Sequence, residues 1–244
     1  MDELDNIYRR IISIKKKYNL TNLYEGNKLE IKLNDLYESM LLQEHILSNV
    51  KRRVIKYDKK NNTHGTLYDL FATLFNIAPD SLFIKEASEH SGINLEDIIA
   101  LIHIESRGRE FSVSRKGAIN RLQLNPKCLD DIYRYVTSRD NLLDKYIIEN
   151  TTKENFLHDL VSNSKLNIFT GINYFKYLKD TTHDECESIV AYCYGPSGAS
   201  DLLEEKDGTT IRYYNDFLEA RDNLNMIKEF AFSDMIKEFA FSVV

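Results

Sequence analysis

Residues 95–105 read Leu-Glu-Asp-Ile-Ile-Ala-Leu-Ile-His-Ile-Glu, and this segment says most about the fold of the domain around it. Apolar side chains fall on every side of such a helix, so the sequence predicts a helix buried inside a domain. Asn94 and Asp97 stand three residues apart at its start, which predicts a capping box. Glu105 ends the helix, immediately before Ser106-Arg107-Gly108. A carboxylate at the end of an apolar segment is partly desolvated, which favours the neutral form that a general acid needs.

Two further segments follow this acid. A turn of small residues, Ser114 to Ala118, contains Gly117, and Leu122-Gln123-Leu124-Asn125-Pro126 comes next. An acid on a buried helix, then a glycine-containing turn, then a glutamine points to a carbohydrate-cleaving site.

The bulk properties favour one helix-rich domain with appendages. The 244 residues suffice for a sizeable core, and 15 Tyr and 12 Phe stand against only 9 Gly and 3 Pro. Counted along the sequence, residues 1–60 carry a net charge of +4 and residues 61–244 one of −10. A nucleic-acid-binding protein would show a dense basic stripe, so this class of partner is excluded.

The cysteines and the apolar runs exclude other classes. Cys128, Cys186 and Cys193 form no Cys-x-x-Cys pair, so neither a disulfide framework nor a zinc knuckle is expected, and no metal site is predicted. No run approaches the roughly 18–20 apolar residues of a membrane span. The acidic start of the chain, Met1 to Asp5, lacks the features of a signal peptide. A substrate outside the cytoplasm would require another export route or a leader absent from this chain.

The pattern along the chain predicts four parts: an N-terminal helical hairpin (1–60), a linker with a short helix (61–80), the main helical domain (81–221) and a tail (222–244). Within the hairpin, a heptad seam runs from Leu29 to Val54. Residues 28–57 therefore either pack on the chain's own domain or bind a helical protein partner. The basic cluster beginning at Lys51 is a solvated helix end or attracts an anionic polymer. The tail repeats an eight-residue segment at a period of nine, from Met226 and again from Met235.

The main domain carries helical periodicity over 168–178, 189–194 and 211–218, and no convincing series of alternating strand residues. The predicted fold class is therefore mostly α.

Read together, these segments resemble the soluble lytic transglycosylase family, relatives of goose-type lysozyme, over residues 81–220. The family pattern is a helix ending in Glu-Ser, then Ser-x-x-Gly-Ala-x-Gly-Leu-Met-Gln-Leu-x-Pro, Asn-Ile-x-x-Gly-x-x-Tyr, Ala-Tyr-Asn-x-Gly-Pro and Glu-Thr-x-x-Tyr. The matching residues, in the same order, are Glu105-Ser106; Ser114, Gly117-Ala118, Leu122-Gln123-Leu124 and Pro126; Asn167-Ile168, Gly171 and Tyr174; Ala191-Tyr192 and Gly195-Pro196; and Thr210 with Tyr213. The resemblance implies a lysozyme-like helical domain.

Four positions depart from the family pattern. Asn120 and Arg121 replace Gly-Leu, Cys193 replaces the asparagine of Ala-Tyr-Asn, and Thr209 replaces the glutamate of the last motif. Asparagine tolerates the left-handed backbone that a glycine position requires, so the turn is expected to survive. Arg121 is expected to lie near the acid, where its charge would lower the carboxyl pKa.

The resemblance implies that Glu105 acts on a peptidoglycan glycan strand at the cell wall, without metal or organic cofactor. The carboxyl would protonate the oxygen between N-acetylmuramic acid and N-acetylglucosamine, and then take the proton of the muramic acid 6-hydroxyl as a 1,6-anhydro ring closes. Tyr192 would hold the rotamer of Glu105. Substrate contacts are expected from Ser106, Ser114 and Gln123, with Tyr174 and Tyr213 as walls of the cleft.

Several alternatives stay open. The same acid would serve a muramidase that uses water, and the replaced residues would suit a silent peptidoglycan-binding or structural homologue. The serines, Gln123 and the tyrosines also have structural readings, as backbone-bonding or core residues. His103 and Glu105 with Cys128 match part of a zinc deaminase signature, but the second cysteine, which would be a zinc ligand, is missing. A nucleophilic Cys193 has no local signature to support it.

Overall fold

The computed structural model describes residues 47–63, 65–126, 132–133, 149, 151–182, 184–204 and 208–242, without the side chains of Leu82, 208–211 and 232–242. The chain divides into two compact units, Met1–Val50 with Ser233–Val244, and Lys51–Phe232. The second unit holds Glu105 and the other motif residues. Residues 1–46 of the expected hairpin, Cys128 and the side chains of Thr209 and Thr210 lie outside the described residues, so the partner predicted for residues 28–57 stays a prediction.

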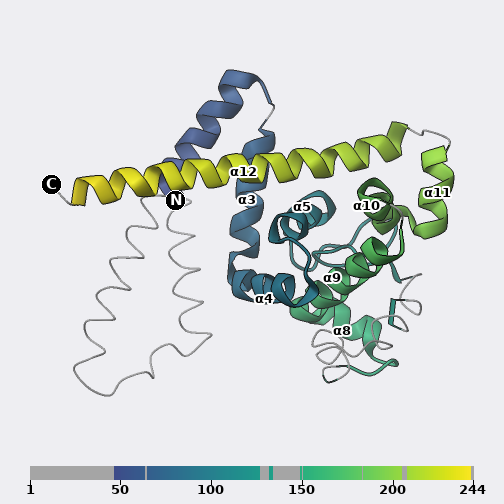
Figure 1. Ribbon diagram of the computed structural model, residues 1–244. Coiled ribbons are helices and arrows are strands. Elements are labelled where there is room, and N and C mark those ends of the chain that lie inside the picture. The colour runs from purple at the N-terminus through teal and green to yellow at the C-terminus, as the bar shows by residue number, and fades with distance from the viewer. Residues whose placement is uncertain are drawn as a thin grey trace, which may run out of the picture. The chain divides into compact units, whose positions relative to one another are not determined.

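Helices make up nearly all of the regular structure in the described part of the chain (Figure 1). Residues 51–61 are helical. The helices after them are α3 (Thr66–Ile77), the 3-10 turn η1 (Ala78–Asp80), α4 (Ser81–Ser91), α5 (Leu95–Ser106), α8 (Phe156–Ser162), α9 (Ser164–Thr181), α10 (Glu185–Tyr194), α11 (Pro196–Glu204) and α12 (Gly208–Ser242). Extended pairing in these ranges is limited to two isolated antiparallel bridges, Val113 with Ile119 and Ile119 with Leu124. The predicted mostly α, lysozyme-like class is confirmed. None of the described helices is long and apolar enough to cross a membrane.

Helix α5 is the buried helix that the sequence predicted. Ile98, Leu101 and Ile102 are almost wholly inaccessible to solvent, and the helix packs against α3 and α4. The expected capping box is wrong. Asn94 occupies the N-cap position without a side-chain hydrogen bond, and the buried Asp97 carboxylate pairs with cations from two other helices.

Helix α9 holds the turn after the acid in place. The side chain of Asn167 accepts a hydrogen bond from the Leu122 amide at 3.1 Å and donates one to the Ile119 carbonyl at 3.3 Å. Gly171, one turn along α9, leaves the space that the Leu122 side chain fills. The motif residues Asn167 and Gly171 therefore fasten the Ile119–Leu124 segment against α9.

Two segments extend further than the sequence pattern indicated. The region predicted as a linker with a short helix contains the 12-residue α3, whose Leu67 and Leu70 are fully buried, so it contributes to the core. The last predicted helix, 211–218, is part of α12, which continues through the predicted tail to Ser242. Buried Leu224 and Ile227 show that α12 packs on the domain beyond residue 221.

Gly171→Ala tests this packing. An added Cβ would lie 2.5 Å from Leu122 Cδ1 and 3.0 Å from the Tyr192 hydroxyl oxygen, so we expect the free energy of unfolding to fall by about 1–3 kcal/mol. Urea denaturation measures the change. Gly198→Ala is the matched control, because its Cβ would meet only Tyr194 Cβ at 3.4 Å, and alanine favours a helix over glycine by about 1 kcal/mol. Equal losses in the two variants would contradict the packing assigned to Gly171.

Candidate active site

Glu105 lies in the last turn of α5, and its carboxyl accepts a hydrogen bond from the Tyr213 hydroxyl of α12. The residue is half-buried, but protein atoms surround the carboxyl closely. Desolvation by this burial raises the pKa of Glu105 to about 7, against the smaller lowering effect of the Tyr213 hydrogen bond. The neutral acid is therefore well populated at neutral pH, as the apolar helix predicted.

The chain leaves α5 directly after this acid. Arg107 adopts a left-handed backbone with φ of 54°, and its amide closes the helix on the His103 carbonyl. Gly108 follows with φ of 71°, at a point where an added Cβ would lie 2.9 Å from Ile77 Cγ2. The Asn76 side chain donates to the Arg107 carbonyl at 2.9 Å. This sharp turn ends the helix one residue beyond Glu105.

Tyr213, and not Tyr192, forms the hydrogen bond to Glu105. The Tyr192 hydroxyl donates to the Leu122 carbonyl at 2.9 Å, so the prediction that it holds Glu105 is wrong. Tyr213, expected as a cleft wall, makes that bond instead. Burial, and then the charge of Glu105, raise the pKa of Tyr213 well above its usual value. Tyr213 therefore keeps its proton and acts as the donor.

Aromatic rings of α9, α10 and α12 contact one another in two groups. Tyr174 of α9 lies 5.6 Å from Tyr192 of α10, measured between ring centroids, and is half-buried. Tyr194 and Tyr213 meet edge to face at 6.4 Å. Phe175 stands edge-on to Tyr192 at 5.9 Å. Tyr174, Phe175 and Tyr192 therefore form one group of contacting rings, and Tyr194 and Tyr213 form a second group, in which Tyr213 bonds to Glu105. A role for Tyr174 as a wall of the substrate cleft stays a prediction.

The remaining predicted contact residues form hydrogen bonds within the protein. Ser106 is buried, and its hydroxyl donates to the Ile102 carbonyl at 3.3 Å. The Ser114 hydroxyl accepts from the Ala118 amide at 2.9 Å, which leaves its own proton to donate. The Gln123 amide nitrogen donates to the Asn120 carbonyl at 2.6 Å and to the Ser112 hydroxyl at 2.8 Å. These side chains shape the turns around the site, and a substrate role for them stays a prediction.

Asn120 preserves the turn in which the family has glycine. Its backbone is left-handed, with φ of 63°, as expected for this position. Its side-chain amide donates to the carbonyls of Leu160 and Val161 at 3.1 and 3.3 Å, and its oxygen accepts from the Arg121 amide at 3.0 Å. The asparagine side chain therefore also connects the turn to α8.

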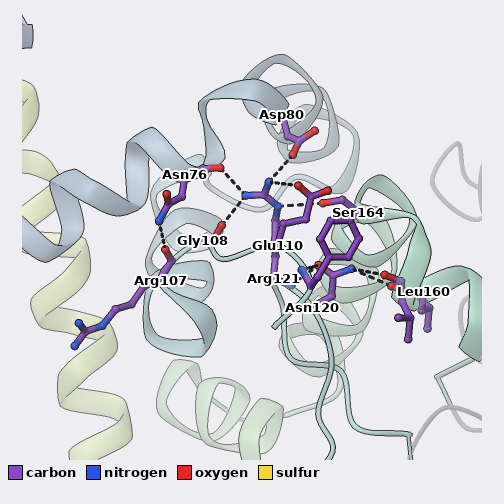
Figure 2. Close-up of polar contacts among 11 residues, drawn as sticks. Asn76, Asp80, Arg107, Gly108, Glu110, Asn120, Arg121, Leu160 and Ser164 are labelled. Carbon is purple, nitrogen blue, oxygen red and sulfur yellow. Dashed lines mark hydrogen bonds and ion pairs between the residues drawn. The ribbon is translucent and has the colours of Figure 1, made fainter. Parts of the chain in front are cut away.

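Arg121 does not approach Glu105, so the prediction that its charge lowers the pKa of the acid is wrong. The guanidinium is buried, and its nitrogens point at oxygens from several elements (Figure 2). Its partners are Ser164 Oγ at 3.0 Å, the Asn76 and Gly108 carbonyls at 2.8 and 2.7 Å, and the carboxylates of Asp80 and Glu110 at 3.0 and 3.6 Å. Arg121 thus ties the loop after α5 to the ends of α3, η1 and α9.

The surroundings of Cys193 and His103 support neither a cysteine nucleophile nor a zinc deaminase site. Cys193 is exposed as a residue, yet desolvation, and then the charge of Glu105, raise the pKa of its thiol to about 11. A thiol so weakly acidic is a poor nucleophile at neutral pH. His103 Nδ1 bonds to Thr73 Oγ1 at 2.8 Å. Within the described residues no group of three His, Cys, Asp or Glu side chains can hold a metal ion.

Comparison with known families agrees with the matched motifs. The model of the transglycosylase SLT domain matches residues 82–215, more than half of the chain, and this range contains Glu105, Tyr192 and Tyr213. No curated protein matches the chain significantly.

Tyr213→Phe tests the bond that holds the acid. Because the hydroxyl stabilises the ionised carboxylate, we expect its removal to raise the pKa of Glu105 above about 7. A ¹³C NMR titration of protein labelled at glutamate measures this pKa. Tyr192→Phe is the control, since the hydroxyl that it removes is bonded to the Leu122 carbonyl. An unchanged pKa in Tyr213→Phe would show that the bond does not stabilise the carboxylate.

Arg121→Leu restores the residue type of the family pattern and leaves the carboxylate of Asp80, 11% exposed, without its cation. Breaking a buried ion pair in this way should lower the free energy of unfolding by about 3–5 kcal/mol. Arg212→Leu breaks the exposed pair with Asp216 and should cost less than about 1 kcal/mol. Chemical denaturation compares the two variants, and a small loss in Arg121→Leu would refute the importance given to its contacts.

Proposed function

Because the chain belongs to the transglycosylase SLT domain family, whose members act on cell-wall peptidoglycan, we propose that it is a lytic transglycosylase. The bond cleaved is the β-1,4 bond between N-acetylmuramic acid and N-acetylglucosamine, and the product carries a 1,6-anhydro ring. The observation that carries the proposal is the carboxyl of Glu105, with its pKa raised to about 7 and one hydrogen-bond donor on it.

The geometry of Glu105 suits the first step. Tyr213 donates to Oε1, so the acidic proton belongs on Oε2. Oε2 gives this proton to the glycosidic oxygen as the bond to C1 breaks. The Tyr213 bond strengthens as negative charge develops on the carboxylate, because a hydrogen bond to an ion is stronger than one to a neutral group.

One carboxyl serves both halves of the reaction. In the described part of the chain, no second carboxylate contributes to the pKa of Glu105, whereas most glycosidases pair two such groups. The acetamido oxygen of the muramic acid therefore stabilises C1, a substrate-assisted route. The Glu105 carboxylate then takes the proton of the 6-hydroxyl, O6 bonds to C1 as the acetamido oxygen leaves, and no water is consumed.

The departures from the family pattern are compatible with activity. Arg121 forms its bonds away from Glu105, and Asn120 keeps the left-handed turn. Cys193, which stands where the family has asparagine, interacts electrostatically with Glu105. Because its thiol is neutral, it adds no charge beside the acid. Ser114, Gln123, Tyr174 and Ser106 are proposed to line or shape the binding surface for the sugars of the cell wall.

Mass spectrometry of digested peptidoglycan tests the reaction. We expect wild type to release anhydro-muropeptides, one water lighter than hydrolytic products, and Glu105→Gln to release none. Glu89→Gln, at an exposed position of α4, is the matched control and should leave the products unchanged.

Other results of this digestion identify the rival functions. Products carrying a reducing-end muramic acid and no anhydro ring would indicate a muramidase. Binding without any product from the wild type would indicate a silent homologue, and either result would refute the proposed reaction.

A further inference from the structure

Polar contacts join α5 to α12 in antiparallel order. Following α5 backwards and α12 forwards, the pairs are Glu105 with Tyr213, Asp97 with Arg221, and Glu96 with Lys228. In the first two pairs, both helices advance by eight residues, or about 12 Å at 1.5 Å per residue. One register of α12 along α5 therefore satisfies both contacts.

The middle pair belongs to a cluster of charges in which one member is deeply buried. Asp97 is 2% exposed, and its two oxygens accept from Lys179 at 3.0 Å and from Arg221 at 3.4 Å. Arg221 also bonds to Glu185 at 2.7 Å. A buried carboxylate is costly without its partners, so this cluster resists displacement. It joins α5, α9, α10 and α12, the helices that carry Glu105, Tyr174, Tyr192 and Tyr213.

The outer pair contributes less to the register. Side-chain exposures of 48% for Lys228 and 32% for Glu96 leave that pair screened by solvent. Arg221 differs because it bonds to both Asp97 of α5 and Glu185 of α10 from its position on α12. A slip of α12 by one residue would move its side chains by about 1.5 Å along the axis and turn them by about 100°. Such a slip breaks both Arg221 bonds and removes the Tyr213 hydroxyl from Glu105.

We propose that Arg221 is a positioning residue for the acid: by bonding to Asp97 and Glu185 it fixes the register of α12 in which the Tyr213 hydroxyl reaches Glu105. Arg221 touches neither Glu105 nor the sugar, and acts through Tyr213. The titratable groups whose pKa values the charge of Glu105 raises are Tyr192, Cys193 and Tyr213, and Tyr174 and Lys116 act in turn on Tyr192 and Cys193. The catalytic consequence rests on the proposed function, whereas the ionisation of Glu105 can be read without turnover.

Lys179 provides a matched control. It bonds to the same buried carboxylate as Arg221, and each cation also lies over a phenylalanine ring, Phe175 for Lys179 and Phe217 for Arg221. Lys179 belongs to α9, however, so its removal weakens the cluster and leaves α12 held by Arg221. If a loss of stability alone changed the pKa of Glu105, substitution of either cation would change it. If the register of α12 sets that pKa, only substitution of Arg221 would change it.

The experiment is a double-mutant cycle read by ¹³C NMR titration of Glu105 in the full chain. We expect Arg221→Met to raise the pKa of Glu105 in the direction of Tyr213→Phe, by about one unit, or tenfold in the ratio of neutral to ionised carboxyl. The double variant should match Tyr213→Phe alone, because Arg221 acts through that hydroxyl. Lys179→Met should keep the wild-type pKa. A wild-type pKa in Arg221→Met, a further shift in the double variant, or an equal shift in Lys179→Met would overturn the proposal.

If Arg221→Met does not fold, Arg221→Lys carries the test. Lysine keeps the charge beside Asp97 but loses the planar fork that reaches Glu185 at the same time, so we expect a smaller rise in the pKa of Glu105. No rise in this variant would overturn the proposal. Failure of the digestion experiment would refute the reaction and leave this result standing.

Discussion

A carboxyl that protein atoms deprive of water, with a single tyrosine hydroxyl as its partner, sets the conditions for the rest of this domain. Burial alone would push Glu105 far toward its neutral form, and the Tyr213 bond limits that shift, so that the pKa is about 7. In the proposed reaction Glu105 loses and regains a proton in one cycle, which requires both forms to be accessible. Maintaining this balance demands that α5 and α12, which are distant in sequence, hold a fixed register.

The replacement of an apolar family residue by Arg121 shows how a buried charge can be accommodated without disturbing a nearby acid. The guanidinium has two carboxylates, two backbone carbonyls and one hydroxyl as partners, so its charge and its donors are both satisfied. Asn76, Asp80 and Ser164 lie at the ends of α3, η1 and α9, and Gly108 and Glu110 lie in the loop after α5. The arginine thus replaces apolar packing with polar links between elements, in the loop that separates the acid from the Asn120 turn.

The sequence predicted those features that depend on local pattern. Periodicity located α5 and its terminal acid, and the tolerance of asparagine for left-handed backbone explained Asn120. Prediction from the sequence failed where the partner of a side chain lies far away in the chain. Nothing near Tyr192 or Tyr213 indicates which hydroxyl reaches Glu105, since the bonded pair is 108 residues apart. Likewise, the direction taken by the Arg121 side chain depends on Asp80 and Glu110, and the ion pairs of Asp97 depend on Lys179 and Arg221, which are distant in sequence.

Cys193 carries a consequence for the durability of the site. Oxidants, alkylating agents and disulfides react with the thiolate, and a pKa of about 11 leaves roughly one thiol in ten thousand ionised at pH 7. Without that desolvation, a thiol at an exposed residue would be open to irreversible oxidation. The desolvation and the negative charge of Glu105 that keep the thiol protonated therefore also slow its oxidation. The domain can thus tolerate a cysteine at this position in oxidising surroundings.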